Sequence, residues 1–215
     1  MISIEDLQSR DRDRGRLTNL AGEVVALPTS VMLDTSIVAA LWLPGTSGVG
    51  SVQKQRAAAV LDVINARSSI GHVALQSSVE LAHLIAVSEY KGELLRNQEQ
   101  HLPALRARFP HQRRFSWSDL MKVDDQPFVR AAMMFRTLCA ALQECNVQFL
   151  YQPGEGTTDG RSYPDILAQE MERHGLDSAD AAILLDARRA GIDAIVTFDT
   201  DLQRASRDFH IFTWL

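Results

Sequence analysis

The sequence predicts an α/β fold in which helices cover both faces of a central parallel sheet. Short apolar runs of strand length alternate along the chain with longer segments whose apolar residues recur at helical spacing. The clearest of these runs leads straight into a helical segment with a capping-type residue at the junction, which is how an α/β unit begins. The 215 residues, 46% hydrophobic and 23% charged, suit one globular domain, with or without an insertion.

The first strand is expected at 31–33, after an N-terminal extension. Residues 1–28 are polar, with arginine and aspartate alternating through 10–16, and fit an extension containing one exposed helix. The elements expected next, in chain order, are a helix at 37–43, a loop at 44–51, a helix at 52–67, a strand at 73–75 and a helix at 77–90.

Residues 91–146 show two further helical patterns, interrupted by prolines and without a strand signal, and we interpret them as a helical insertion. Glycine stops follow the last two expected helices. The remaining elements are expected as a strand at 147–151, a loop at 153–163, helices at 164–174 and 177–190, and strands at 194–198 and 209–214. The predicted organisation is therefore an extension at 1–28 and a domain at 29–215 with its insertion at about 91–146.

Composition argues against a membrane or a secreted protein. No apolar stretch approaches the ~18 residues of a membrane helix, and the N-terminal residues lack the apolar core of a signal peptide. Cys139 and Cys145 stand six positions apart in a predicted helix and cannot bridge each other there, which agrees with a reducing compartment. We therefore expect a cytoplasmic location, and the net charge of −5 argues against a general nucleic-acid coat.

Acidic residues follow two of the predicted strands. The apolar run D193-A-I-V-T-F-D-T-D201 ends in Asp199 and Asp201, and Asp34 directly follows the strand at 31–33. Side chains at i and i+2 of a strand point to the same face, so two carboxylates there repel unless a cation lies between them. Ligands of open parallel sheets bind beyond the carboxyl ends of the strands. The pattern predicts a cation site at this edge.

Asp180 and Glu80 lie in predicted helices, where helix capping or the helix dipole is an alternative to a role in the cation site. Asp177 can cap the helix at 177–190 while Asp180 favours the positive end of its dipole, and Glu80 fits a capping box in S77-S-V-E80. Capping does not explain why the strand ends are acidic as well. Carboxylates and hydroxyls without histidine or cysteine form a ligand set for Mg²⁺ or Mn²⁺.

In order and spacing, four segments resemble a PIN domain, the metal-dependent nuclease fold of the VapC-type toxins. The segments are V31-M-L-D34-T-S, S-V-E80-L, S-A-D180-A-A-I-L-L-D-A-R-R-A-G191 and I195-V-T-F-D199-T-D201-L. The resemblance covers roughly 31–90 and 147–215, and the interval between Glu80 and Asp180 is longer than in the small toxins. It implies a three-layer α/β/α domain with Asp34, Glu80, Asp180 and Asp199 as the catalytic and metal-binding quartet. It further implies that Asp201 is an additional ligand or positions water, and that Ser36 and Thr197 supply supporting hydroxyls.

The activity that the resemblance implies is hydrolysis of RNA phosphodiester bonds by an endoribonuclease that uses Mg²⁺ or Mn²⁺. The chain would be the toxin of a toxin–antitoxin pair, with an antitoxin-like protein partner, and a homodimer is allowed. One alternative is a catalytically inactive PIN fold that binds RNA or docks a partner. Another is a haloacid-dehalogenase-like phosphatase, although that class has a second aspartate where this chain has Ser36.

The insertion contains a basic segment with interleaved aromatic residues. The segment R106-A-R-F-P-H-Q-R-R-F-S-W117 carries Arg106, Arg108, Arg113 and Arg114 among two phenylalanines and a tryptophan. Arginine can hold phosphate and aromatic rings can stack on bases, so we predict that these arginines bind the substrate. The alternative is a solvated helical face whose aromatic residues anchor in the core.

Overall fold

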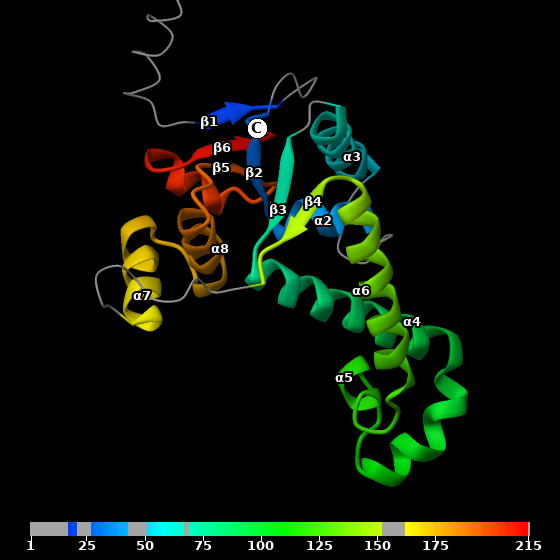
Figure 1. The fold of residues 1–215 in the computed structure, drawn as a ribbon. Coiled ribbons are helices and arrows are strands. Elements are labelled where there is room, and N and C mark those ends of the chain that lie inside the picture. Colours follow the sequence, from blue (N-terminus) through cyan, green and yellow to red (C-terminus); the bar gives the residue numbers. More distant parts are fainter. Residues whose placement is uncertain (1–16, 21–26, 43–50, 67–68, 152–161, 215) are drawn as a thin grey trace, which may run out of the picture.

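The computed structural model describes residues 17–20, 27–42, 51–66, 69–151 and 162–214, and these confirm the predicted α/β class with an all-parallel sheet (Figure 1). The strands are β1 (Leu17–Asn19), β2 (Ser30–Leu33), β3 (Ile70–Val73), β4 (Val147–Phe149), β5 (Ala194–Val196) and β6 (His210–Thr213). The helices are α2 (Thr35–Trp42), α3 (Ser51–Ala66), α4 (Leu75–Arg108), α5 (Trp117–Leu120), α6 (Gln126–Glu144), α7 (Tyr163–His174), α8 (Ser178–Arg189) and the 3₁₀ helix η1 (Asp201–Arg207).

The six strands lie in the order β1-β6-β5-β2-β3-β4. From β2 the chain builds the sheet outward through β3 and β4, then returns to the other side of β2 for β5 and β6. The strand order thus reverses between β2 and β5, which are direct neighbours with Leu33 paired to Val196. In open α/β sheets, ligands bind beyond the carboxyl ends of the strands at such a reversal.

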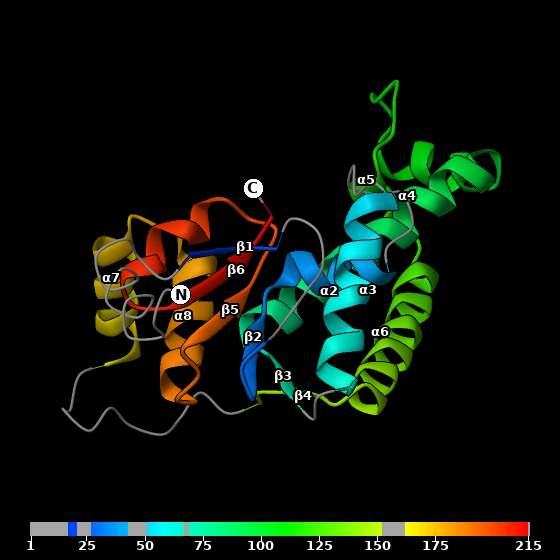
Figure 2. The same ribbon diagram turned by 90° about the horizontal axis from the view of Figure 1, so that it is seen from above.

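Helices cover both faces of the sheet, which makes the three predicted layers (Figure 2). Alternate side chains of β2 point to opposite faces, because successive residues of a strand alternate. Val31 and Leu33 pack with residues of α2, α3 and α6, whereas Met32 packs with residues of α8 and η1. Both faces of β2 are therefore buried, as expected for a central parallel strand.

The N-terminal extension contributes a strand where we expected only an exposed helix. Leu17, Thr18 and Asn19 pair in parallel with β6, and the Thr18 hydroxyl lies 2.7 Å from His210 Nε2. An edge strand keeps only one side paired and can be polar, so the apolar signal of a strand was missing here. Residues 1–16 and 21–26, and most of the loops expected at 44–51 and 153–163, lie outside the described residues.

The strand bounds differ from those predicted. β3 spans 70–73 rather than 73–75, β4 ends at Phe149 rather than at residue 151, and β5 ends at Val196 rather than at residue 198, while β2 and β6 differ by one residue at their ends. The helix stops were predicted correctly, since Gly175 and Gly191 both adopt left-handed backbone, with φ of 64° and 68°. Both cysteines are free.

Helix α4 runs much further than the helix predicted at 77–90. It continues through Pro103 to Arg108, with a break in helical geometry at Asn97, where φ is −129° and ψ is 25°. Neither glycine nor proline marks this position. The described part of the predicted insertion contains only helices and their connections. Across all described residues, no helix is both long and apolar enough to cross a membrane.

Candidate functional site

Asp34 is the buried anchor of the acidic cluster. It directly follows β2, and its backbone amide donates to the Val196 carbonyl at the end of β5. The hydroxyls of Ser36 and Thr197 both donate to Asp34 Oδ2, at 2.6 Å and 2.7 Å. Burial raises the pKa of the Asp34 carboxyl, and these hydrogen bonds oppose that rise. The structure thus places both predicted supporting hydroxyls on one carboxylate.

The same two hydroxyls position the segment after β5. Thr197 Oγ1 accepts a hydrogen bond from the Asp199 amide at 2.8 Å, and Ser36 Oγ accepts one from the Phe198 amide at 3.1 Å. Thr197 is completely buried, whereas Asp199 is exposed. A hydroxyl bridge therefore fixes where Asp199 leaves the sheet relative to Asp34.

Glu80 reaches this edge of the sheet from α4. Its Oε2 accepts a hydrogen bond from the Thr35 hydroxyl at 2.6 Å, and its Oε1 accepts one from Gln76 Nε2 at 3.0 Å. Because α4 already begins at Leu75, Glu80 lies in its second turn, and the capping box considered for it does not form. Thr35, which the sequence reasoning overlooked, connects Glu80 to the residue next to Asp34.

The start of α4 is held by α8. The Leu75 amide donates to Asp186 Oδ2 at 3.2 Å, and the preceding Ala74 offers no side-chain cap. Burial raises the pKa of Asp186, and the hydrogen bond from Leu75 opposes the rise. Asp186 thereby docks the helix that carries Glu80 onto the helix that carries Asp180.

Asp180 shows that the four acids share one environment. Asp177 caps α8, as the sequence indicated, by accepting from the amides of Ala179 and Asp180 at 2.9 Å and 3.0 Å. The pKa of Asp180 is raised to about 7, first by burial and then by the negative charges of Asp177, Asp34, Asp199 and Glu80. Asp180 therefore lies within electrostatic reach of the other three carboxylates of the predicted quartet.

Asp201 departs from the expected arrangement. Since β5 ends at Val196, Asp199 and Asp201 do not alternate along a strand, and the expectation that both point to one strand face is wrong. Asp201 begins η1, where its carboxylate pairs with Arg204 at 2.9 Å and its amide donates to Asp199 Oδ1 at 2.8 Å. Its contact with the quartet runs through its backbone.

The donor set of the quartet fits a hard divalent cation. It offers carboxylate and hydroxyl oxygens, the ligands that Mg²⁺ and Mn²⁺ prefer. No three of the quartet's ligand atoms lie within 4.8 Å of one another. Mg²⁺ keeps several waters and is typically held by one or two carboxylates together with substrate phosphates, so it does not need three protein carboxylates to meet at one point.

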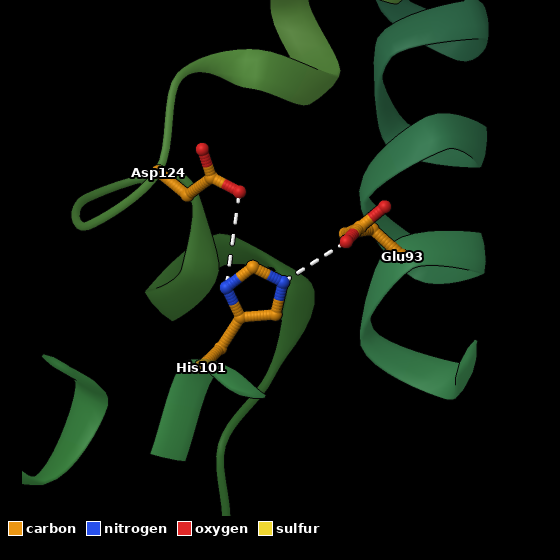
Figure 3. Close-up of side chains that lie close together, drawn as sticks. All are labelled: Glu93, His101 and Asp124. Atoms are coloured by element: carbon orange, nitrogen blue, oxygen red, sulfur yellow. Dashed lines mark hydrogen bonds and ion pairs between the residues drawn. The ribbon is translucent and has the colours of Figure 1, made fainter. Parts of the chain in front are cut away.

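A second cluster of ionisable groups lies on the predicted insertion, where Glu93, His101 and Asp124 approach one another (Figure 3). His101 Nε2 lies 3.0 Å from Glu93 Oε1, and Nδ1 lies 3.8 Å from Asp124 Oδ2. The imidazole thus turns a different nitrogen to each carboxylate, whereas a metal requires one nitrogen and both carboxylates to converge on a point. Arg130 already neutralises Glu93 from the other side, at 2.7 Å. We interpret the cluster as an ion-pair network.

This network was invisible in the sequence. Glu93 and His101 stand eight positions apart, which in a straight helix separates them by ~12 Å. The break at Asn97 brings them together, and Asn97 itself donates to Glu93 Oε1 at 2.9 Å. His101 therefore joins an ion-pair network with partners that its sequence neighbours did not indicate.

The four arginines predicted to bind substrate lie apart from the acidic quartet. Arg106 and Arg108 are in the last turn of α4, Arg113 and Arg114 are in the connection to α5, and all four are exposed. No ion pair involving any of them occurs among the described residues.

Two comparisons with known proteins add no relative, since no family model matches the chain and no curated protein is significantly similar to it.

Proposed function

We propose that the chain is a Mg²⁺- or Mn²⁺-dependent endoribonuclease that uses Asp34, Glu80, Asp180 and Asp199. The observation that carries this proposal is the position of Asp180 among the charges of Asp34, Asp199 and Glu80, from three other segments, which add to the effects of burial and Asp177 in raising its pKa to about 7. Like charges gathered at a sheet edge are relieved by protonation or by a bound cation, and a divalent ion would compensate several of them at once. The motif resemblance to PIN domains supports RNA as the substrate.

The residues of the acidic quartet have different roles in the proposed mechanism. Asp34 is held rigidly by two hydroxyls and provides a fixed ligand, while Glu80 and Asp199 approach from α4 and from the segment after β5. Asp34, Glu80 and Asp199 would hold a divalent ion, which would supply a Lewis acid and offset charge that develops on the phosphate. Asp180, whose pKa is raised to about 7, holds its proton more readily than a free carboxyl and would give it up as a cation binds.

Cleavage of labelled RNA tests the proposal directly. Purified protein is incubated with a single-stranded RNA in Mg²⁺ or Mn²⁺, in excess chelator, and with the corresponding DNA strand. We expect cleavage of the RNA that needs the metal and is lost in Asp34→Asn, Glu80→Gln and Asp180→Asn. Asp62→Asn is the matched control, because Asp62 is exposed on α3 and lies outside the cluster.

Cleavage that persists in excess chelator would overturn the metal mechanism. Full activity in all three variants would overturn the site. Metal-stabilised binding of RNA without cleavage would favour the inactive binding module. We also propose an antitoxin-like partner that covers the acidic cluster and suppresses cleavage, and its addition should protect Asp180 and its neighbours from hydrogen exchange.

A further inference from the structure

We infer that the helical arm carries a second phosphate-binding site, so that the preferred substrate is an RNA strand long enough to reach both this site and the acidic quartet. The arm is defined as residues 91–136, which comprise the outer part of α4, α5 and the first half of α6. Figures 1 and 2 both show it projecting from the body of the domain, with α5 and its connections far from β5 and β6. The inference rests on the proposed function for the identity of the strand.

The arm is a braced structure. Tyr90 donates its hydroxyl to the Asp124 carbonyl at 2.8 Å, which fastens α4 to the connection before α6. Arg130 of α6 reaches back to α4 and binds Glu89 at 3.0 Å and Glu93 at 2.7 Å. These contacts, with the His101 network, fix the position of the outer arm relative to α4, which also carries Glu80.

The acidic groups of the arm, apart from the exposed Glu99, have partners within it, whereas no ion pair to the four arginines at its end occurs among the described residues. Residues 106–116 contain four arginines and no acidic residue. The nearest acid, Asp119, accepts hydrogen bonds from the Ser116 amide and hydroxyl and from Gln112, and these bonds lower its pKa. The end of the arm is thus a local positive patch on a chain whose net charge is −5.

The chemistry of the patch fits a phosphodiester backbone. Guanidinium groups match phosphate oxygens bidentately and keep their charge at every physiological pH. Phe109 and Phe115 stand among the arginines and are only partly buried, and the Lys122 ammonium lies 5.4 Å from the centre of the Phe109 ring. Arginines with interleaved aromatic residues are typical of single-strand binding. The acidic quartet repels the same backbone unless a cation is present, so the patch supplies binding that does not depend on metal.

The test measures RNA binding in a background that does not cut. Asp34→Asn protein is titrated without metal against a labelled RNA of about 20 nucleotides, at several salt concentrations. Each phosphate contact contributes roughly 0.7 to the slope of log K against log salt for single strands. Adding Arg113→Gln and Arg114→Gln should flatten the slope by about 1.4 and weaken binding about tenfold near ~0.15 M salt.

Two variants control for charge and folding. Lys54→Gln with Arg207→Gln removes two exposed cations from α3 and η1 and should leave the slope unchanged. Arg113→Lys with Arg114→Lys should restore the slope, because it restores the charge. Equal affinity and slope in the glutamine variant and the parent would overturn the inference. The arginines would then be available to bind an acidic protein partner.

Cleavage assays in protein that keeps Asp34 separate this inference from the proposed function. With Mg²⁺, the Arg113→Gln, Arg114→Gln protein should cut a short RNA of about three nucleotides as the parent does and a long RNA more slowly. An equal loss on both lengths would contradict a second site. No cleavage by the parent on either length would refute the nuclease while leaving the salt-slope result to decide the arm.

Discussion

Replacing Asp180 by asparagine is expected to stabilise the metal-free protein above pH 7. The carboxyl group is half-buried at the start of α8 and is surrounded by the charges of Asp177, Asp34, Asp199 and Glu80, which together with burial raise its pKa to about 7. Above that pH the group is ionised among like charges. An amide has nearly the same shape and carries no charge, so the substitution removes this repulsion.

The pH window follows from the two ionisation states. The pKa of the Asp180 carboxyl is 3.8 in the unfolded chain and about 7 in the folded protein. Between these values the folded protein binds more protons, so stability falls as pH rises, and the loss is complete above about pH 7. At ~1.36 kcal/mol per pH unit the interval corresponds to at most about 4 kcal/mol. Screening by water around a half-buried group reduces it to about 1–2 kcal/mol.

Thermal melts in chelator provide the assay. At pH 8 the Asp180→Asn protein should melt about 2–8 °C above wild type, since 1 kcal/mol shifts a domain of this size by about 2–4 °C. The advantage should shrink progressively as pH is lowered toward 4. Asp62→Asn, the exposed control on α3, should stay within about 0.5 kcal/mol of wild type.

Addition of Mg²⁺ should then reverse the order. Wild type gains stability by mass action, and the variant, which lacks one ligand, gains less. A variant that melts below wild type in chelator at pH 8, or a difference that does not change with pH, would refute the reasoning. Asp180 would then be a structural carboxylate of α8 and not part of a cation site.

Three further substitutions probe a hydrogen bond to Asp34, the glycine that ends α7 and an ion pair of the arm. Thr197→Val keeps the shape but leaves the buried Asp34 carboxylate one donor short, and should cost about 1–3 kcal/mol in denaturant unfolding; unchanged stability would mean that water replaces the hydroxyl. Gly175→Ala forces a side chain onto backbone with φ of 64°, with no atom within 4 Å to clash, and should cost about 1 kcal/mol; a larger loss, measured in urea, would point to packing. Arg130→Met should cost about 2 kcal/mol by leaving Glu93 with a missing partner, and hydrogen exchange should locate the loss in the arm.

The sequence was sufficient for the fold class and for the neighbouring positions of Asp34 and Asp199, whereas Glu80 and Asp180 were chosen from the resemblance to PIN domains. Strand-length apolar runs that lead into helices predicted the parallel sheet, and parallel strands necessarily bring their carboxyl ends to one edge. Asp34 and Asp199 follow neighbouring strands for this reason. The metal and catalytic roles of the quartet stay predictions until cleavage is measured.

The parts that failed depend on contacts between distant segments. Thr35 and Asp186 matter because of partners 45 and 111 residues away, which no local pattern reveals. β1 has a polar composition that only its pairing with β6 explains. Asp201 was misplaced because the strand before it ends two residues earlier than its predicted run, and Thr197, the next residue, donates its hydroxyl to Asp34.

The insertion of β5 between β2 and β6 has a consequence during protein synthesis. Asp34 leaves the ribosome early, but Thr197 and Asp199, which complete its surroundings, are added only after most of the chain. At ~5–20 residues per second, that interval is roughly 10–30 s. Throughout it the nascent chain holds only part of the quartet and has no partner for the β5 side of β2. Under the proposed activity, a ribosome-bound chain therefore cannot cut the message from which it is being translated until β5 has emerged and paired.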